Sequence, residues 1–187
     1  VSVVNALSIR LEVEIKRDGS KYAISFKNGK KASKLKKIGK VGKRNTGSTV
    51  RFWPNEQYFD TVKFSVRRLK HVLRAKAVLC PRLTVTFTNK HKGETDSWYF
   101  EDGLKDYLVE NLSGYDRIPE EPFVGEQEGK EEIVNWAVIW LPEQGQIITE
   151  SYVNLIPTSQ GGTHVNGFRS GLLAAVREFC EFRNLIP

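Results

Sequence analysis

Two runs of alternating residues near the start of the chain constrain its fold most. Apolar residues alternate with charged ones over residues 11–15, and larger apolar residues alternate with smaller side chains over 22–26. A period of two is the spacing of a strand with one face turned to the core. Asp18-Gly19 lies between the runs, and an Asp-Gly pair favours the tight turn of a β-hairpin. The sequence therefore predicts an antiparallel hairpin here.

Other segments of the first hundred residues are assigned by the same two periods. Residues 1–8 resemble the tail of a buried helix, and the basic, glycine-containing stretch 27–44 predicts a loop with one short strand. The remaining elements expected in this half are a strand at 49–53 ended by Pro54, an amphipathic helix over 64–79, and a second hairpin from 83–88 and 97–100.

The second half continues the mixture of strands and helices. A short helix is expected over 103–112 with Asp102 as its N-cap, and a longer one from Val165 onward with Thr163 as its N-cap. Residues 113–130 are rich in Pro, Gly and Glu and predict a connection. A third hairpin is expected from 133–141 and 146–154. Strands with a few helices segregated between them indicate the α+β class.

Charge divides the chain into two parts. Residues 1–100 hold 23 basic and 7 acidic side chains, a net charge of +16, whereas residues 101–187 hold 6 and 15, a net charge of −9. No acidic residue lies between Asp18 and Glu56, where there are eleven basic ones. This asymmetry predicts two domains, 1–101 and 102–187, and a polyanion near the first. The alternative is a lysine-rich loop that contacts only solvent.

Composition excludes some classes of protein. Hydrophobic residues make up 40% of the 187, enough for a globular core, and no apolar run approaches the ~18 residues of a membrane span. Cys80 and Cys180 lack the spacing of a metal site and indicate reduced cysteines in a cytosolic protein. The chain contains no Met, even at position 1. We therefore expect it to be a piece of a longer protein.

The segment Gly161–Arg169 holds the residues most suggestive of chemistry. Thr163 and His164 could act as nucleophile and general base, but no acidic residue stands nearby in sequence to orient the imidazole, so a helix entry is favoured. Gly161-Gly162 before a helix could cradle a phosphate, although the spacing of a P-loop is absent. The basic stretch 27–44 could contact a nucleic-acid backbone, and it lacks the aromatic residues of a base-stacking platform.

Three segments in order resemble one family. Residues 1–8 (VSVVNALS), 45–54 (NTGSTVRFWP) and 161–169 (GGTHVNGFR) are similar to the ATPase subunit of bacterial type IIA DNA topoisomerases. The resemblance covers essentially the whole chain. Residues 76–81 and 149–158 look more like the B subunit of the topoisomerase IV branch than that of the gyrase branch, which stays the alternative.

The resemblance implies a domain plan and an activity. Residues 1–101 would be the C-terminal part of a GHKL-type α/β-sandwich ATPase domain, and 102–187 the first part of a transducer domain similar to the second domain of ribosomal protein S5. In this family, ATP binding dimerises two such chains and closes a gate on duplex DNA, with the A subunit of topoisomerase IV as the cleaving partner. The implied cofactors are ATP and Mg²⁺, and the implied location is the bacterial cytoplasm, with no membrane.

The same resemblance assigns residues to sites. Val1 would lie just past the glycine-rich ATP lid, near the phosphates. Ser48 would reach the adenine through its hydroxyl, Val50 would close the apolar floor of the pocket, and Arg17 would stand at its mouth, where aminocoumarins bind. Arg169 resembles the transducer arginine that faces the DNA cavity.

The residues that would hydrolyse ATP are expected outside the chain. The catalytic glutamate, the magnesium-binding asparagine and the lid glycines belong before Val1 in the family, and the lysine that reaches the γ-phosphate belongs after Pro187. No catalytic residue is therefore assigned, no ATP turnover is expected from the 187 residues alone, and apolar surface should be exposed at Val3, Val4 and Leu7. A basic nucleic-acid-binding module is the alternative from a different class.

Overall fold

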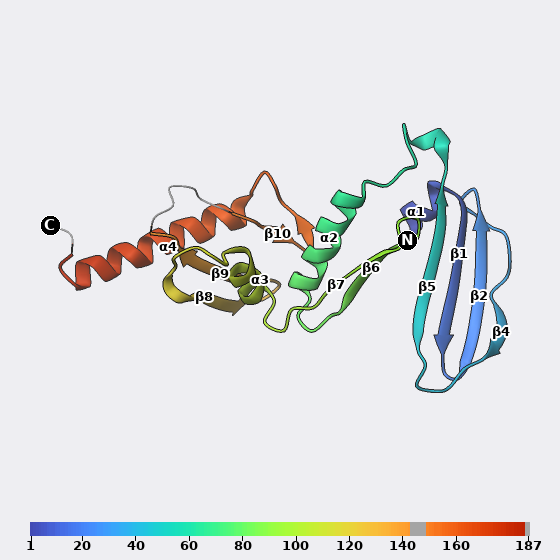
Figure 1. Cartoon of the computed structure of the whole chain (residues 1–187), viewed down its shortest axis with the longest axis horizontal. Helices are drawn as coiled ribbons and strands as arrows, with labels where there is room; N and C mark the ends of the chain where they lie inside the picture. The colour runs from blue at the N-terminus through green and yellow to red at the C-terminus, as the bar shows by residue number, and fades with distance from the viewer. Residues whose placement is uncertain (143–148, 186–187) are drawn as a thin grey trace. The chain divides into compact units, whose positions relative to one another are not determined.

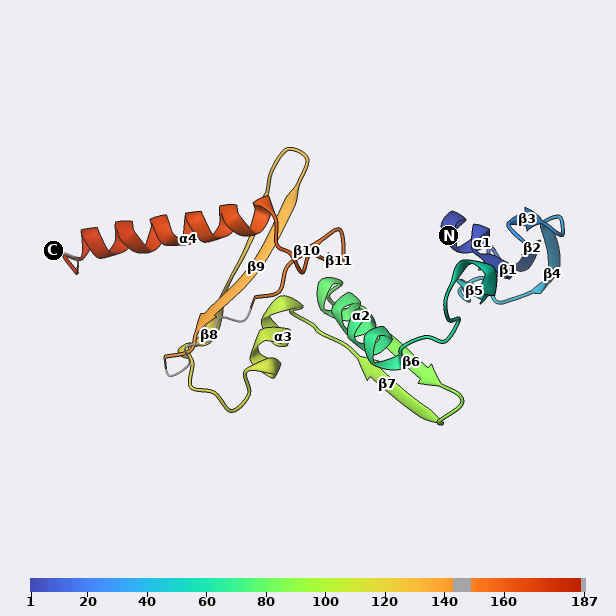
Figure 2. The same ribbon diagram turned by 90° about the horizontal axis from the view of Figure 1, so that it is seen from above.

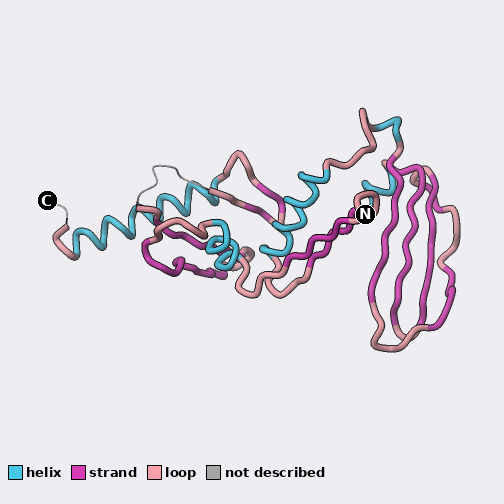
Figure 3. Tube along the Cα trace, viewed as in Figure 1, coloured by secondary structure: helices cyan, strands magenta, loops and turns pink. Residues whose placement is uncertain are grey.

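The computed structural model describes residues 1–142 and 149–185, and the chain forms two compact units, Val1–Ser65 and Val66–Pro187 (Figure 1). Both units combine helices with antiparallel strands, which confirms the α+β class (Figure 3). The division at Ser65 differs from the boundary at residue 101 that the sequence predicts. That predicted domain boundary stays a prediction.

The first unit is built on an antiparallel sheet of five strands. Its strand order is β3-β2-β1-β5, and β4 also pairs with β2. Its elements are α1 (Ser2–Ala6), β1 (Ser8–Arg17), β2 (Ser20–Lys27), β3 (Lys30–Lys31), β4 (Lys36–Lys40), β5 (Gly47–Pro54) and the 3₁₀ turn η1 (Glu56–Tyr58).

The predicted hairpin of β1 and β2 is confirmed. Asp18 and Gly19 both have positive φ, 51° and 73°, as the turn of a two-residue hairpin requires. The prediction for residues 27–44 was wrong in part, because two short strands form there. Both pair with β2, and a backbone ladder with a ready partner outweighs the weak strand preference of lysine.

The N-terminal helix forms as predicted, but it is not buried. Val3 is 71% exposed and Val4 37%, while Leu7 is half-buried. Within its unit α1 contacts β1 and β5, and it is tied down by polar bonds: the Asn5 side-chain amide donates to the carbonyl oxygen of Gly29 (3.0 Å), and the Ser8 hydroxyl donates to that of Val4 (2.6 Å). A five-residue helix held in this way leaves its apolar side chains in solvent.

In its described residues, the second unit combines helices with three two-stranded antiparallel sheets, β6-β7, β8-β9 and β10-β11 (Figure 2). Its elements are α2 (Val66–Leu79), β6 (Val85–Asn89), β7 (Glu94–Trp98), α3 (Leu104–Asn111), β8 (Ile118–Glu128), β9 (Ile133–Trp140), β10 (Tyr152–Val153), β11 (Ile156–Pro157) and α4 (Thr163–Phe182).

The core of this unit gathers around the C-terminal half of α2. Ala77, Val78 and Phe100 are buried there, and side chains of β6, β7 and α3 pack against them. The Phe100 and Tyr107 rings meet edge to face with centroids 6.2 Å apart. The core therefore joins α2 to α3 across the β6-β7 hairpin.

Two predictions for this half are wrong. The stretch 113–130 contains the eleven-residue strand β8, which pairs with β9, whereas β10 pairs with β11. The expected pairing of 133–141 with 146–154 is therefore not what the described residues show, and residues 143–148 lie outside them. Pro119 and Pro122 hid the strand, because proline is tolerated in a strand that pairs along one edge only.

Both predicted N-caps are also wrong. Gly103 caps α3 and Gly162 caps α4, and neither helix has a side-chain cap bond. Asp102 instead donates its backbone N–H to the Asp106 carboxylate (2.8 Å), and Thr163 is the first residue of α4. Glycine occupies both N-cap positions because neighbouring atoms lie too close for a side chain. At Gly103, an added Cβ would lie 2.8 Å from the Val78 carbonyl oxygen.

We expect Gly103→Ala to destabilise the second unit by about 1–3 kcal/mol, because it adds a backbone clash to a positive φ of 54°. Urea unfolding followed by tryptophan fluorescence measures the change. Gly93→Ala is the matched control, since Gly93 has a similar φ (68°) but open space around it and carries the conformational cost alone. Equal losses in the two variants would contradict the close approach at Gly103.

Candidate functional site

The register of the first unit gives its sheet one apolar face. Residues directly opposite one another in an antiparallel pair lie on the same face. This face, called the apolar face below, is made by alternate residues of β1 with their partners on β5 and β2: Leu11, Val13, Ile15, Phe52, Val50, Ser48, Phe26, Ile24 and Tyr22.

Ser48 and Val50 belong to this face. Val50 lies opposite Val13 and is 45% exposed, and Ser48 lies opposite Ile15 with its hydroxyl among apolar neighbours. A hydroxyl on an otherwise apolar, half-open surface can bind a flat polar ring by one directed hydrogen bond while the alkyl groups contact the ring face.

Arg17 and Val1 lie at opposite ends of β1. Arg17 is the last residue of β1 and lies two residues beyond Ile15, at the end of the apolar face where Ser48 lies. Its guanidinium is exposed and lies 3.4 Å from the Asp18 carboxylate. Val1 precedes α1 at the end where β1 begins, and it is 80% exposed (Figure 1). The structure thus groups Ser48, Val50 and Arg17 but not Val1.

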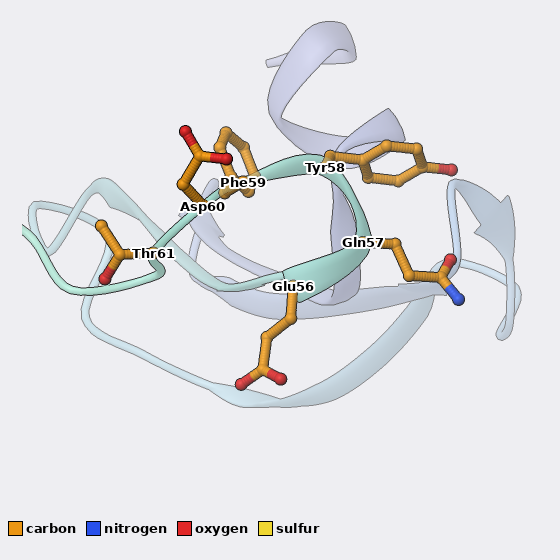
Figure 4. Close-up of a pocket in the computed structure, with 6 residues that line it drawn as sticks. All are labelled: Glu56, Gln57, Tyr58, Phe59, Asp60 and Thr61. Carbon is orange, nitrogen blue, oxygen red and sulfur yellow. The ribbon is translucent and has the colours of Figure 1, made fainter.

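A hollow of the first unit surrounds η1. It has a volume of about 620 Å³ and is lined by residues 56–61. Figure 4 shows the Glu56 and Asp60 side chains pointing away from each other on either side of the ribbon. Because these acids do not converge, the hollow offers no paired-carboxylate chemistry.

Arg169 lines a hollow of about 480 Å³ in the second unit. The hollow lies between α4, the segment from Thr149 to Gly162, and His71 of α2. Arg169 itself is exposed. Its side chain is therefore accessible to solvent on this side of α4.

The Glu150 carboxylate connects α3 to β10 beside this hollow. Glu150 accepts hydrogen bonds from the Tyr107 hydroxyl (3.0 Å) and the Tyr152 hydroxyl (2.7 Å). Burial raises the pKa of Tyr152, and the neighbouring Glu150 charge raises it further. Burial and Glu150 also raise the pKa of Tyr107, while Arg74 over its ring opposes them. Sequence reasoning missed this cluster, because Tyr107 and Glu150 are far apart in sequence.

His164 has hydroxyl neighbours rather than an acid. Its Nε2 lies 3.2 Å from the Thr158 hydroxyl, which is 2.7 Å from the Ser151 hydroxyl. Within the described residues, no carboxylate bonds His164. An added Cβ at Gly162 would lie 2.8 Å from the imidazole, so the glycine makes room for the ring. This geometry favours a structural role for His164 at the entry to α4.

Two kinds of site are absent from residues 1–142 and 149–185. No group of three or more His, Cys, Asp or Glu side chains able to hold a metal ion occurs among them. No helix among them is long and apolar enough to cross a membrane.

The chain is similar to known proteins over its whole length. It is 62% identical to the B subunit of DNA topoisomerase 4 from Pseudomonas aeruginosa and 57% identical to that from Escherichia coli, each over all 187 residues and 30% of the relative. The family profile described as DNA gyrase B matches residues 103–187. The chain belongs to the family of topoisomerase IV and gyrase B subunits. It spans about 30% of the length of the curated relatives it matches.

Solved structures of this family share the fold. The topoisomerase IV ATP-binding domain of Francisella tularensis, in complex with a small-molecule inhibitor, is 46% identical with a TM-score of 0.79, over 97% of this chain and 48% of that one. The 43K ATPase domain of Thermus thermophilus gyrase B, in complex with an aminocoumarin, is 29% identical with a TM-score of 0.82, over 100% and 50%. These likenesses confirm the predicted family and fold.

We expect Glu150→Gln to lower the pKa of Tyr152 towards the ordinary tyrosine value, because the substitution removes the negative charge beside the phenol. Ultraviolet titration of phenolate absorbance, with Tyr152→Phe to identify the signal, measures the shift. Glu110→Gln is the control, because it also removes one carboxylate charge but Glu110 bonds Arg74 (3.0 Å) and not Tyr152. An unchanged Tyr152 titration in Glu150→Gln would contradict the cluster.

Proposed function

We propose that this chain supplies the sheet wall of an ATP pocket and the start of a transducer in a type II DNA topoisomerase of the topoisomerase IV kind. The observation that carries the proposal is the half-open apolar face on which the Ser48 hydroxyl lies beside Val50. Relatives named as topoisomerase subunits, and solved neighbours named as ATP-binding and ATPase domains, support it. The parent enzyme would couple ATP hydrolysis to duplex passage, giving decatenation and relaxation.

The apolar face fits an adenine ring. Ser48 would hydrogen-bond the ring edge, directly or through water, while Val50 contacts its face. Arg17 would stand at the mouth and contact an aminocoumarin, the ligand class named for the Thermus thermophilus structure. Val1 would lie near the phosphates, a role that rests on the family resemblance, since it stands at the other end of β1.

The domain plan proposed is 1–101 for the ATP-binding part and 102–187 for the transducer part, whose fold would be like the second domain of ribosomal protein S5. The start of the family match at residue 103 supports this division. Arg169 would face the cavity through which DNA passes, consistent with its exposure on α4. Mg²⁺ would be held by residues other than those described here.

The partners proposed follow from the family. The parent protein would dimerise on binding ATP, act on duplex DNA with the A subunit of topoisomerase IV, and work in the bacterial cytoplasm. The gyrase alternative is less well supported, since the gyrase B structure is 29% identical and the topoisomerase 4 relative 62%.

A chimera tests the proposed function. The 187 residues replace their counterpart in the B subunit of Pseudomonas aeruginosa topoisomerase 4, with which they align end to end. We expect the chimera, mixed with the matching A subunit, to decatenate linked DNA circles only when ATP is present. A folded chimera with no ATP-dependent activity would overturn the proposal.

Within the chimera, we expect Ser48→Ala to weaken ATP binding about five-fold, the loss of roughly 1 kcal/mol for one neutral hydrogen bond. Equilibrium binding of a fluorescent ATP analogue measures it. Thr49→Ala is the matched control, because the neighbouring hydroxyl lies opposite Glu14 on the other face of the sheet. Equal weakening by both substitutions would contradict a hydrogen bond between Ser48 and the nucleotide.

A further inference from the structure

The face of the first sheet opposite the apolar face carries an ordered array of cations. We call it the charged face. The register aligns Arg10, Lys27 and Lys30 in one row across β1, β2 and β3, because Lys27 lies opposite both of the others. At the other end of β1, Lys16 lies directly opposite Lys21.

Cations outnumber anions on this face. Its two carboxylates, Glu12 and Glu14, stand against seven basic side chains: Arg10, Lys16, Lys21, Lys27, Lys30, Lys36 and Arg51. Both carboxylates are already in ion pairs. Glu12 contacts Arg10 and lies 4.0 Å from Arg51, and Glu14 accepts from Lys21 at 2.9 Å, a bond that lowers the Glu14 pKa.

Four lysines of the array have no ion pair among the described residues. Lys16 is half-buried and donates to the Asn45 side-chain oxygen (3.5 Å). The other three, Lys27, Lys30 and Lys36, are exposed, and none has an ion pair within 4 Å among residues 1–142 and 149–185. Lys27 and Lys30 face each other across neighbouring strands, which are ~4.8 Å apart in a sheet. Like charges placed directly opposite destabilise a sheet, and a bound polyanion would relieve that cost.

Protection of the sheet edge explains only part of the array. Lysines on an edge strand discourage pairing with other chains, and this accounts for those of β3 and β4. It does not account for the Arg10–Lys27 and Lys16–Lys21 pairs, because β1 and β2 are both paired along their two edges. These interior rows call for another role.

We propose that the charged face is a docking surface for the sugar–phosphate backbone of duplex DNA. Lysine ammonium groups act as point charges for phosphate, and a grid of them fits a regular line of phosphates. A single strand is a poorer fit, because the one tryptophan of this face, Trp53, already lies under Arg10 (4.9 Å) and no second aromatic side chain extends a stacking row among the described strands.

The docking surface lies on the opposite side of the sheet from Ser48 and Val50, so DNA and nucleotide would not compete for it. The inference rests on the proposed function only in choosing DNA among polyanions. Binding would be independent of base sequence, since backbone contacts carry no sequence information.

The test compares two triple variants of the 187-residue chain. Lys27→Gln, Lys30→Gln and Lys36→Gln together remove three charges from the charged face. Lys31→Gln, Lys37→Gln and Lys40→Gln remove three exposed charges from β3 and β4, on the apolar side of the sheet. Anisotropy of a labelled mixed-sequence duplex, between about 50 and 200 mM salt, gives the affinity and its salt dependence.

We expect the charged-face variant to reduce the slope of log affinity against log salt by about 2.7, three contacts at ~0.9 each, and the control to change it by less than about one. Equal effects of the two variants would mean that only net charge matters and would overturn the inference. No duplex binding by the native chain, or tighter binding to single strands or heparin, would overturn it too. If the native chain does not bind duplex DNA but the chimera is active with ATP, this inference fails and the proposed function stands. If the native chain binds duplex DNA but the folded chimera is inactive, the inference stands and the proposed function fails.

Discussion

The pairing of β1 along both of its edges is the constraint on which the first unit depends. Because β2 and β5 are both antiparallel to β1, each residue of β1 fixes the face of a partner on either side. Val13 aligns with Val50 and Ile24, whereas Glu14 aligns with Thr49 and Ala23. A slip by one residue would exchange the two faces. The register therefore separates the apolar face from the charged face, which lie on opposite sides of one sheet.

The second unit depends on contacts between segments distant in sequence. The Phe100 core fixes α2 against α3, and Glu150 then joins α3 to β10 through two phenol hydroxyls. From β10 the contacts continue through Ser151 and Thr158 to His164 at the start of α4. Polar contacts thus connect α3 to the helix that carries Arg169, and Gly162 before α4 leaves room for the imidazole ring.

The alternation of residues in β1, β2 and β5, the Asp18-Gly19 turn and the helical spacing of α2 and α4 were all readable from the sequence, because each is a local pattern. The strand β8 was not, since two prolines and several glutamates obscure a strand that exists by pairing with β9. The caps were misassigned for a similar reason. Asp102 and Thr163 have the right chemistry, but close backbone approach, at the Val78 carbonyl and at the His164 ring, selects glycine instead.

The sequence by itself determined the family, the α+β class and the cationic character of the first hundred residues, because ordered motifs, periodicity and charge are properties of the chain. Only the tertiary structure decided which lysines share a face, that Ser48 and Val50 open onto the same apolar surface, and that Glu150 binds two tyrosines. The physical reason is that strand register and long-range packing bring together side chains with no sequence relation. A one-residue difference in register changes the face of a side chain but leaves composition and motif unchanged.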